Sequence, residues 1–97
     1  MNNSKKSNLN IKNLLVVDDD QRIRDLLKEY LMNEGFVIST ADSAENAREK
    51  IKYVTFDLII LDVMMPGDNG LKLTKEIRLA SQVPIILLTA KSEIDSK

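Results

Sequence analysis

The sequence contains no cysteine and no histidine, and each absence removes a class of chemistry. Without cysteine the chain forms no disulfide, has no thiol nucleophile and cannot build a zinc ribbon. Without histidine it has no Ser-His-Asp triad, no HExxH metal site and no imidazole general base. Any chemistry of this chain must therefore come from carboxylates, hydroxyls, lysine or a metal.

Excess charge of one sign and long apolar runs are also lacking. The 14 Lys and Arg residues against 15 Asp and Glu give a net charge of -1, whereas nucleic-acid binding favours a strongly basic surface. No apolar run reaches the roughly 18 residues of a membrane span, and the first dozen residues lack the apolar centre of a signal peptide. We therefore expect a cytoplasmic chain that contacts neither a membrane nor nucleic acid directly.

The length of 97 residues suits one domain, and 43% hydrophobic with 30% charged residues is typical of a globular chain. We expect residues 1–12 to form a flexible polar tail and residues 13–97 to form the domain. Four short segments predict β-strands, and three of them are apolar almost throughout, as in strands buried on both faces. The four segments are residues 14–17, 36–40, 58–61 and 84–88.

The stretches between these strands have the period of amphipathic helices. The first predicted helix follows a cap at Asp20 and ends at Gly35. Its apolar stripe is formed by Ile23, Leu26, Leu27, Tyr30 and Leu31. The second has a cap at Asp42 or Ser43, and its inward residues are Ala44, Ala47, Ile51 and Val54.

The third predicted helix covers roughly residues 71–80, with Leu73 and Ile77 on one face. The preceding stretch has the composition of a loop, with Pro66, Gly67 and Gly70, and residues 92–97 resemble the start of another helix. Strands alternating with helices over short connections predict right-handed βαβ units and a mostly parallel, doubly wound α/β sheet.

Polar residues follow three of the predicted strands. They are Asp18, Asp19 and Asp20 after the first, Asp62 after the third and Thr89 after the fourth. In open α/β sheets the sites form at the carboxyl ends of the strands. Clustered carboxylates repel one another unless a cation neutralises them. Because the ligands are oxygen atoms only, Mg²⁺, Ca²⁺ or Mn²⁺ is favoured, with Mg²⁺ the best match. A carboxylate at such a site can also act as a nucleophile toward phosphate.

Each of these residues also has a structural interpretation. An Asp after a strand is a common helix cap, and Asp20 fits that role. The agreement of two strand ends favours a site for Asp18, Asp19 and Asp62, whereas Thr89 is equally consistent with an ordinary strand end. We expect Met64 and Met65 to serve in packing.

Three motifs resemble the receiver domain of bacterial two-component response regulators, most closely the class with a winged-helix DNA-binding domain. They are LLVVDDD at 14–20, LIILDVMMPGDNGL at 58–71 and PIILLTAK at 84–91. The resemblance implies a flavodoxin-like (CheY-like) fold and Mg²⁺-dependent transfer of a phosphoryl group to Asp62 from a sensor histidine kinase or a small donor. It further implies that Asp18, Asp19, Asp62 and the main-chain carbonyl of Met64 bind the metal. Thr89 would be the switch hydroxyl that binds the phosphoryl group, and the region around the fourth strand would repack.

Receivers have five βα units, whereas four are recognisable here, without the fifth strand, the family's lysine downstream of Ala90, the aromatic switch residue and the last helix. We therefore expect an incomplete receiver that acts as a phosphoacceptor rather than an enzyme. A phosphorylation-independent interaction module and an inactive truncated receiver remain alternatives. A Mg²⁺-dependent phosphatase with an Asp nucleophile fits less well, because Met64 stands where such enzymes place a second carboxylate. Without a fifth strand, the apolar residues 85–88 form a sheet edge, and we expect the chain to self-associate there.

Overall fold

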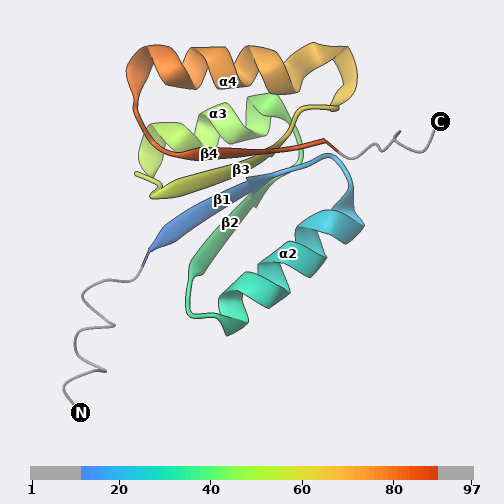
Figure 1. The fold of residues 1–97 in the computed structure, drawn as a ribbon, viewed down its shortest axis with the longest axis vertical. Coiled ribbons are helices and arrows are strands. Elements are labelled where there is room, and N and C mark those ends of the chain that lie inside the picture. Colours follow the sequence, from blue (N-terminus) through green and yellow to red (C-terminus); the bar gives the residue numbers. More distant parts are fainter. Residues whose placement is uncertain (1–11, 90–97) are drawn as a thin grey trace.

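A computed structural model describes residues 12–89 of the chain. Strands and helices alternate along it as predicted (Figure 1). The elements are β1 (Asn13–Val17), α2 (Gln21–Asn33), β2 (Val37–Ala41), α3 (Ala44–Tyr53), β3 (Leu58–Asp62), the 3₁₀ helix η1 (Pro66–Asp68), α4 (Asn69–Ala80) and β4 (Ile85–Leu88). Residues 1–11 of the predicted tail at 1–12, and the predicted helix at residues 92–97, lie outside the described residues.

The four strands form one parallel sheet in the order β2-β1-β3-β4. Val17 of β1 pairs with Ala41 of β2 and with Leu61 of β3, so the carboxyl ends of these strands lie in register. This order is that of a flavodoxin-like sheet, in which the first strand lies inside. The strand order reverses there: β2 is added on one side of β1, and β3 and β4 are added on the other. The predicted fold class is confirmed.

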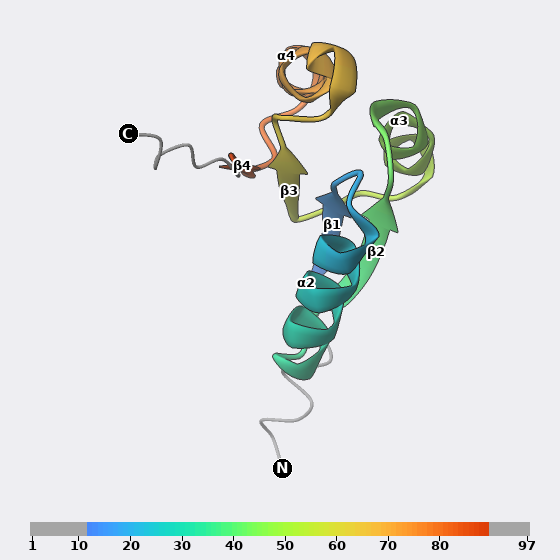
Figure 2. The ribbon, with the colours of Figure 1, turned by 90° about the vertical axis from the view of Figure 1, so that its right-hand side faces the viewer.

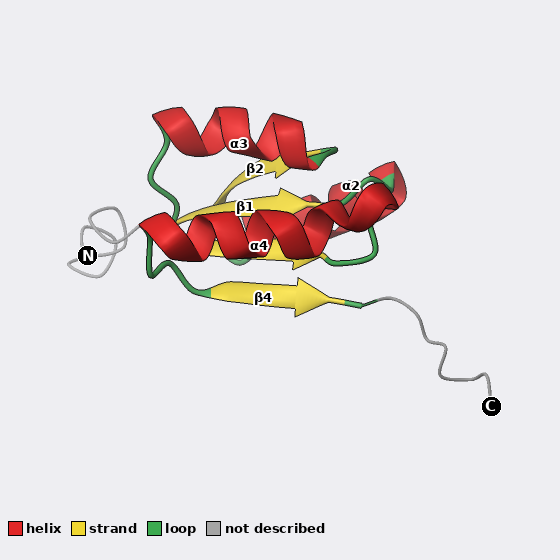
Figure 3. Ribbon diagram, turned by 90° about the horizontal axis from the view of Figure 1, so that it is seen from above, coloured by secondary structure: helices red, strands yellow, loops and turns green. Residues whose placement is uncertain are grey.

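Helices cover both faces of the sheet. Figure 2 shows α3 and α4 on one side and α2 on the other, and Figure 3 shows α4 running above the strands. The main core lies between the sheet and the α3–α4 layer, and its central residues include Leu15, Leu61, Leu73 and Ile77. Leu73 and Ile77 are buried, as the period of the third helix predicted.

The ends of α2 follow the predicted signals. Asp20 is the N-cap, and its side chain accepts a hydrogen bond from the Arg22 N–H. At the other end Gly35 has a φ of 101°, a left-handed conformation that glycine adopts without strain. The Phe36 N–H then donates to the Leu31 carbonyl. Because Phe36 completes this helix end, β2 begins at Val37 and not at Phe36 as predicted.

The predicted inward stripe of α2 is only partly correct. Leu26 and Tyr30 are 63% and 60% exposed, and no residue of α2 is fully buried. Among the described strands, α2 packs mainly against β1 and β2, and these contacts leave Leu26 and Tyr30 exposed. Periodicity identified the amphipathic helix but could not specify which neighbours cover its flanks.

Two further expectations in the α3–α4 layer were wrong. Val54 was predicted to face inward, but α3 ends at Tyr53 and the extended, exposed Val54 is its C-cap. Gly70 was assigned to a loop, but η1 leads directly into α4 and Gly70 lies buried in the first turn of that helix. Ser43 is the observed cap of α3, as one of the two predicted candidates. Within residues 12–89, no helix has the length and apolar character that a membrane span requires.

Candidate acidic site at the carboxyl end of the sheet

Three carboxylates meet where β1 and β3 end. Asp18, Asp19 and Asp62 each offer an oxygen atom, and these atoms all lie within 4.8 Å of one another. Because Val17 and Leu61 are paired in adjacent parallel strands, the residues that follow them, Asp18 and Asp62, lie side by side at the carboxyl end of the sheet. The convergence of these three residues, predicted from the strand ends, is therefore present in the fold.

The site is partly withdrawn from solvent. Asp18 and Asp62 are 5% and 7% exposed, whereas Asp19 is exposed. Burial raises the pKa of the Asp18 carboxyl group, and the charges of Asp62, Asp19 and Asp20 act in the same direction. A hydrogen bond from the Asp20 N–H to Asp18 Oδ1, at 2.9 Å, opposes this shift. The buried carboxylate is therefore in a state that a cation would relieve.

Asp20 belongs to the helix cap, as predicted. Its carboxylate accepts from the Arg22 main-chain N–H at 2.9 Å and also pairs with the Arg22 guanidinium. These hydrogen bonds to Arg22 lower the pKa of Asp20. The Asp20 carboxylate therefore bonds to the first turn of α2, while the carboxylates of Asp18 and Asp19 lie near that of Asp62.

The other predicted site residues lie at the same end of the sheet. The Met64 main-chain N–H donates to Asp62 Oδ1 at 2.8 Å, and the Met64 side chain is exposed. The expectation of a packing role was wrong for Met64 and correct for Met65, which is buried in the core. Thr89 is exposed and directly follows β4, whose end is joined to β3 through a hydrogen bond from Val63 N–H to the Leu88 carbonyl.

Arg24 was not identified from the sequence, and Gly70 was identified only as part of the loop that shapes the pocket. Arg24 Nη1 donates to the main-chain carbonyl of Asp18 at 2.9 Å. Gly70 lies against the backbone of Asp62 and Val63, where it leaves no room for a Cβ atom. A hollow of about 220 Å³ also adjoins the site, and its lining includes Asp19, Ser43, Pro66 and Asn69. For Arg24, the only signal in the sequence was its spacing of one helical turn from Asp20, which places its side chain near the start of the helix.

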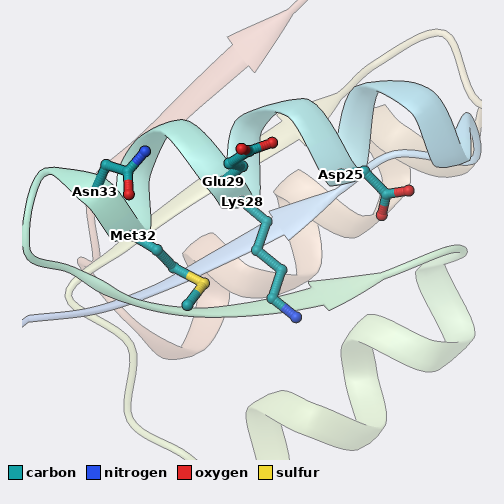
Figure 4. Close-up of a pocket in the computed structure, with 5 residues that line it drawn as sticks. All are labelled: Asp25, Lys28, Glu29, Met32 and Asn33. Carbon is teal, nitrogen blue, oxygen red and sulfur yellow. The ribbon is translucent and has the colours of Figure 1, made fainter.

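A second hollow of about 250 Å³ lies on α2 alone (Figure 4). Its lining residues are Asp25, Lys28, Glu29, Met32 and Asn33. Their charges are mixed, and none of them belongs to the acidic cluster. This hollow is therefore not part of the acidic site.

The acidic cluster fits a hard divalent cation. All its ligand atoms are carboxylate oxygens, the donors that Mg²⁺ takes in proteins together with water. Ligands of this kind without sulfur or imidazole nitrogen disfavour zinc and copper. Burial and the neighbouring carboxylates raise the pKa of Asp18, and a bound cation would offset both effects.

Comparison with known proteins gives one consistent result. The sequence profile of the response regulator receiver domain matches residues 14–97. The protein PetR of Rhodobacter capsulatus is 49% identical over 80 residues, which cover 82% of this chain and 34% of PetR. The chain thus spans about a third of the length of the curated relatives that it matches.

Solved structures agree with the sequence comparison. The fold is similar to that of the response regulator protein TrrA of Thermotoga maritima in complex with Mg²⁺-BeF, with a TM-score of 0.78 and 48% identity over 90% of this chain and 76% of TrrA. It is similar with a TM-score of 0.76, at the same identity and coverage, to the structure of the histidine kinase ThkA in complex with TrrA.

Proposed function

This chain belongs to the response regulator receiver domain family, and we propose that it accepts a phosphoryl group on Asp62 in two-component signal transduction. The observation that carries the proposal is the meeting of Asp18, Asp19 and Asp62 within 4.8 Å at the carboxyl end of the sheet. The chain is a phosphoacceptor rather than a turnover enzyme, because Asp62 itself becomes the modified product.

Asp18, Asp19 and Asp62, with the main-chain carbonyl of Met64, would hold Mg²⁺. When bound, this cation supplies positive charge that offsets the carboxylates and the phosphoryl oxygens. Asp18 is the most buried ligand of the set and is fixed through its Oδ1 by the Asp20 N–H. Asp19 is exposed and completes the cluster from the solvent side.

Asp62 is oriented for attack by its own loop. The Met64 N–H donates to Oδ1, which limits rotation of the carboxylate. An ionised oxygen of Asp62 attacks the phosphorus atom of the donor, and the bond from phosphorus to the donor nitrogen or oxygen breaks. The donor leaves with that electron pair and Asp62 becomes an acyl phosphate. The Thr89 hydroxyl would then donate to a phosphoryl oxygen and draw the end of β4 inward.

We propose a sensor histidine kinase as the donor, by analogy with the ThkA–TrrA complex, and a cytoplasmic location for this encounter. Support for Mg²⁺ comes likewise from the TrrA complex with Mg²⁺-BeF. Direct binding of nucleic acid is not part of the proposal, since the net charge is -1.

The edge strand supports self-association as a second kind of contact. Ile86 and Leu87 are exposed on β4, which lies at the end of the strand order within the described sheet. An exposed apolar edge strand favours pairing with another chain. We therefore propose that two copies associate through β4.

Phosphotransfer to the 97-residue chain tests the proposal. We expect radiolabelled acetyl phosphate to label the wild-type chain with Mg²⁺ present and not with chelator. Asp62→Asn should abolish the label. Asp25→Asn removes an exposed carboxylate of α2 instead and should keep it. Equal labelling of both variants would rule out Asp62 as the acceptor.

A further inference from the structure

We propose that Arg24 is a positioning residue for the acidic site, which holds the loop of Asp18, Asp19 and Asp20 in the conformation that brings two carboxylates to Asp62. This inference rests on the proposed function for its link to Mg²⁺ and phosphoryl transfer. Its structural part concerns this chain alone.

Arg24 is bonded to both ends of the loop. Its Nη1 donates to the Asp18 carbonyl at 2.9 Å, and its main-chain N–H donates to the Asp20 carbonyl at 3.1 Å. Within the loop, the Asp20 N–H donates to Asp18 Oδ1. The chain segment between β1 and α2 is therefore closed by one arginine from the first turns of the helix.

The hydrogen bond from the Arg24 guanidinium lies just beyond the last paired residue of β1. β1 ends at Val17, and the Asp18 N–H still donates a hydrogen bond to the carbonyl of Ala41, the last residue of β2. The carbonyl of the nearly buried Asp18 requires a donor, since unpaired buried carbonyls are costly. Arg24 supplies that donor from the helix, and a charged donor makes a stronger hydrogen bond than a neutral one.

Because the carboxylates of the cluster repel one another, the loop that carries two of them must be held in place. Three carboxylates lie within 4.8 Å of one another, and in the absence of a cation their repulsion favours an outward movement of the most exposed carboxylate. Asp19 is the exposed member, and it is the central residue of the loop that Arg24 closes. Holding both flanks of Asp19 keeps the ligand set assembled before the metal arrives.

Arg22 offers a matched comparison in the same helical turn. Its guanidinium pairs only with Asp20 among the described residues, and its side chain is 89% exposed. Arg22 therefore acts on the helix cap, whereas Arg24 acts on the residue that belongs to the cluster. Loss of each guanidinium removes the same charge from α2, so the two variants separate position from net charge.

The test uses Arg24→Met, which keeps the aliphatic stem and the helix propensity, with Arg22→Met as control. Mg²⁺ affinity is measured by NMR titration, and amide hydrogen exchange at Asp19 is measured without metal. Residues that orient ligands typically contribute about 10–100-fold to metal affinity. We expect Arg24→Met to weaken Mg²⁺ binding at least about tenfold and to accelerate exchange at Asp19. Arg22→Met should stay within about twofold, and Arg24→Lys should recover part of the loss.

The proposal is overturned if folded Arg24→Met binds Mg²⁺ like Arg22→Met and exchanges at Asp19 like the wild type. If Arg24→Met does not fold, Arg24→Lys decides the question. If Arg24→Lys binds Mg²⁺ more weakly than the wild type, the result supports a positioning role for Arg24. If its Mg²⁺ affinity equals that of the wild type, Arg24 contributes to stability alone. Failure of the wild-type chain to bind Mg²⁺ would instead refute the proposed function. In that case, amide exchange at Asp19 in Arg24→Met and in the wild type would still test whether Arg24 holds the loop.

Discussion

Gly70 in the first turn of α4 lies directly against the main chain of Asp62. A Cβ atom on Gly70 would overlap the Asp62 carbonyl oxygen and would stand 2.5 Å from the Cα atom of Val63. Thr74 Oγ1 donates to the Gly70 carbonyl at 2.9 Å and closes this turn of the helix. The proposed phosphoacceptor and the start of α4 are thus packed with no side chain between them.

Gly70→Ala should therefore disturb both stability and the site. Overpacking of this kind typically costs about 1–3 kcal/mol, and the forced shift of Asp62 or α4 should slow labelling of Asp62. Urea unfolding and the labelling rate measure the two effects. Gly35→Ala is the control, because its cost arises from a φ of 101° with no atom near the Cβ position. Labelling of Gly70→Ala at the wild-type rate would show that the contact is not needed.

Removal of one clustered charge should stabilise the metal-free chain. Asp18→Asn keeps an oxygen that can accept from the Asp20 N–H and removes the repulsion from Asp19 and Asp62. We expect a gain of about 1 kcal/mol, which corresponds to roughly 4–8 °C in Tm for a domain of this size. Thermal unfolding with chelator present measures it. A lower Tm for the variant would mean that the carboxylates do not repel one another significantly.

Asp19 and Asp20 should have separable roles although they are adjacent. Asp19→Ala should abolish Mg²⁺ binding, because it removes a member of the cluster. Asp20→Ala should cost about 1 kcal/mol through loss of the α2 cap and should leave Mg²⁺ binding in place. Metal titration and urea unfolding of both variants check this, and loss of Mg²⁺ binding in Asp20→Ala would place Asp20 among the ligands.

The ion pair of Arg48 and Glu76 should make stability depend on acid pH. Hydrogen bonding to Arg48, at 2.7 Å from Nε to Oε1, lowers the pKa of Glu76. The unfolded chain then takes up a proton at this residue before the folded chain does. The stabilising contribution is complete above the pKa of the unfolded carboxyl group and is lost as the pH falls through the lower folded pKa.

Glu76→Gln should reduce this loss of stability on acidification. Unfolding midpoints measured from neutral pH downward give the comparison with the wild type. Glu49→Gln is the control, because Glu49 pairs with Lys52 within α3 at 3.5 Å and joins no second helix. An unchanged pH dependence in Glu76→Gln would mean that the α3–α4 pair is absent in solution.

One charge introduced on the exposed edge of β4 should weaken self-association. Ile86 is 49% exposed on the edge strand, so Ile86→Lys should weaken a dimer without moving Asp18 or Asp62. Leu79→Lys replaces an exposed leucine of α4 and should leave the association unchanged. Light scattering gives the mass of each variant. A monomeric wild-type chain at micromolar concentration, with cooperative melting, would contradict the proposal.

The fold and the acidic cluster were predictable for the same reason. Apolar strands of a parallel sheet end at one edge, and Asp18 and Asp62 are the residues at which their apolar runs stop. Arg24 was not predictable, because its bond to the Asp18 carbonyl depends on how α2 is oriented over the sheet. Gly70 was assigned to a loop, because its composition signal does not report the close approach of α4 to Asp62.

Phosphoryl transfer to Asp62 is tested most directly when the modified residue is mapped. The wild-type chain is treated with acetyl phosphate and Mg²⁺, the acyl phosphate is trapped by reduction, and the peptides are analysed by mass spectrometry. We expect the modification on Asp62, and we expect it to disappear with chelator or in Asp19→Ala. Modification at another carboxylate, or equal modification of Asp62 without Mg²⁺, would contradict this expectation.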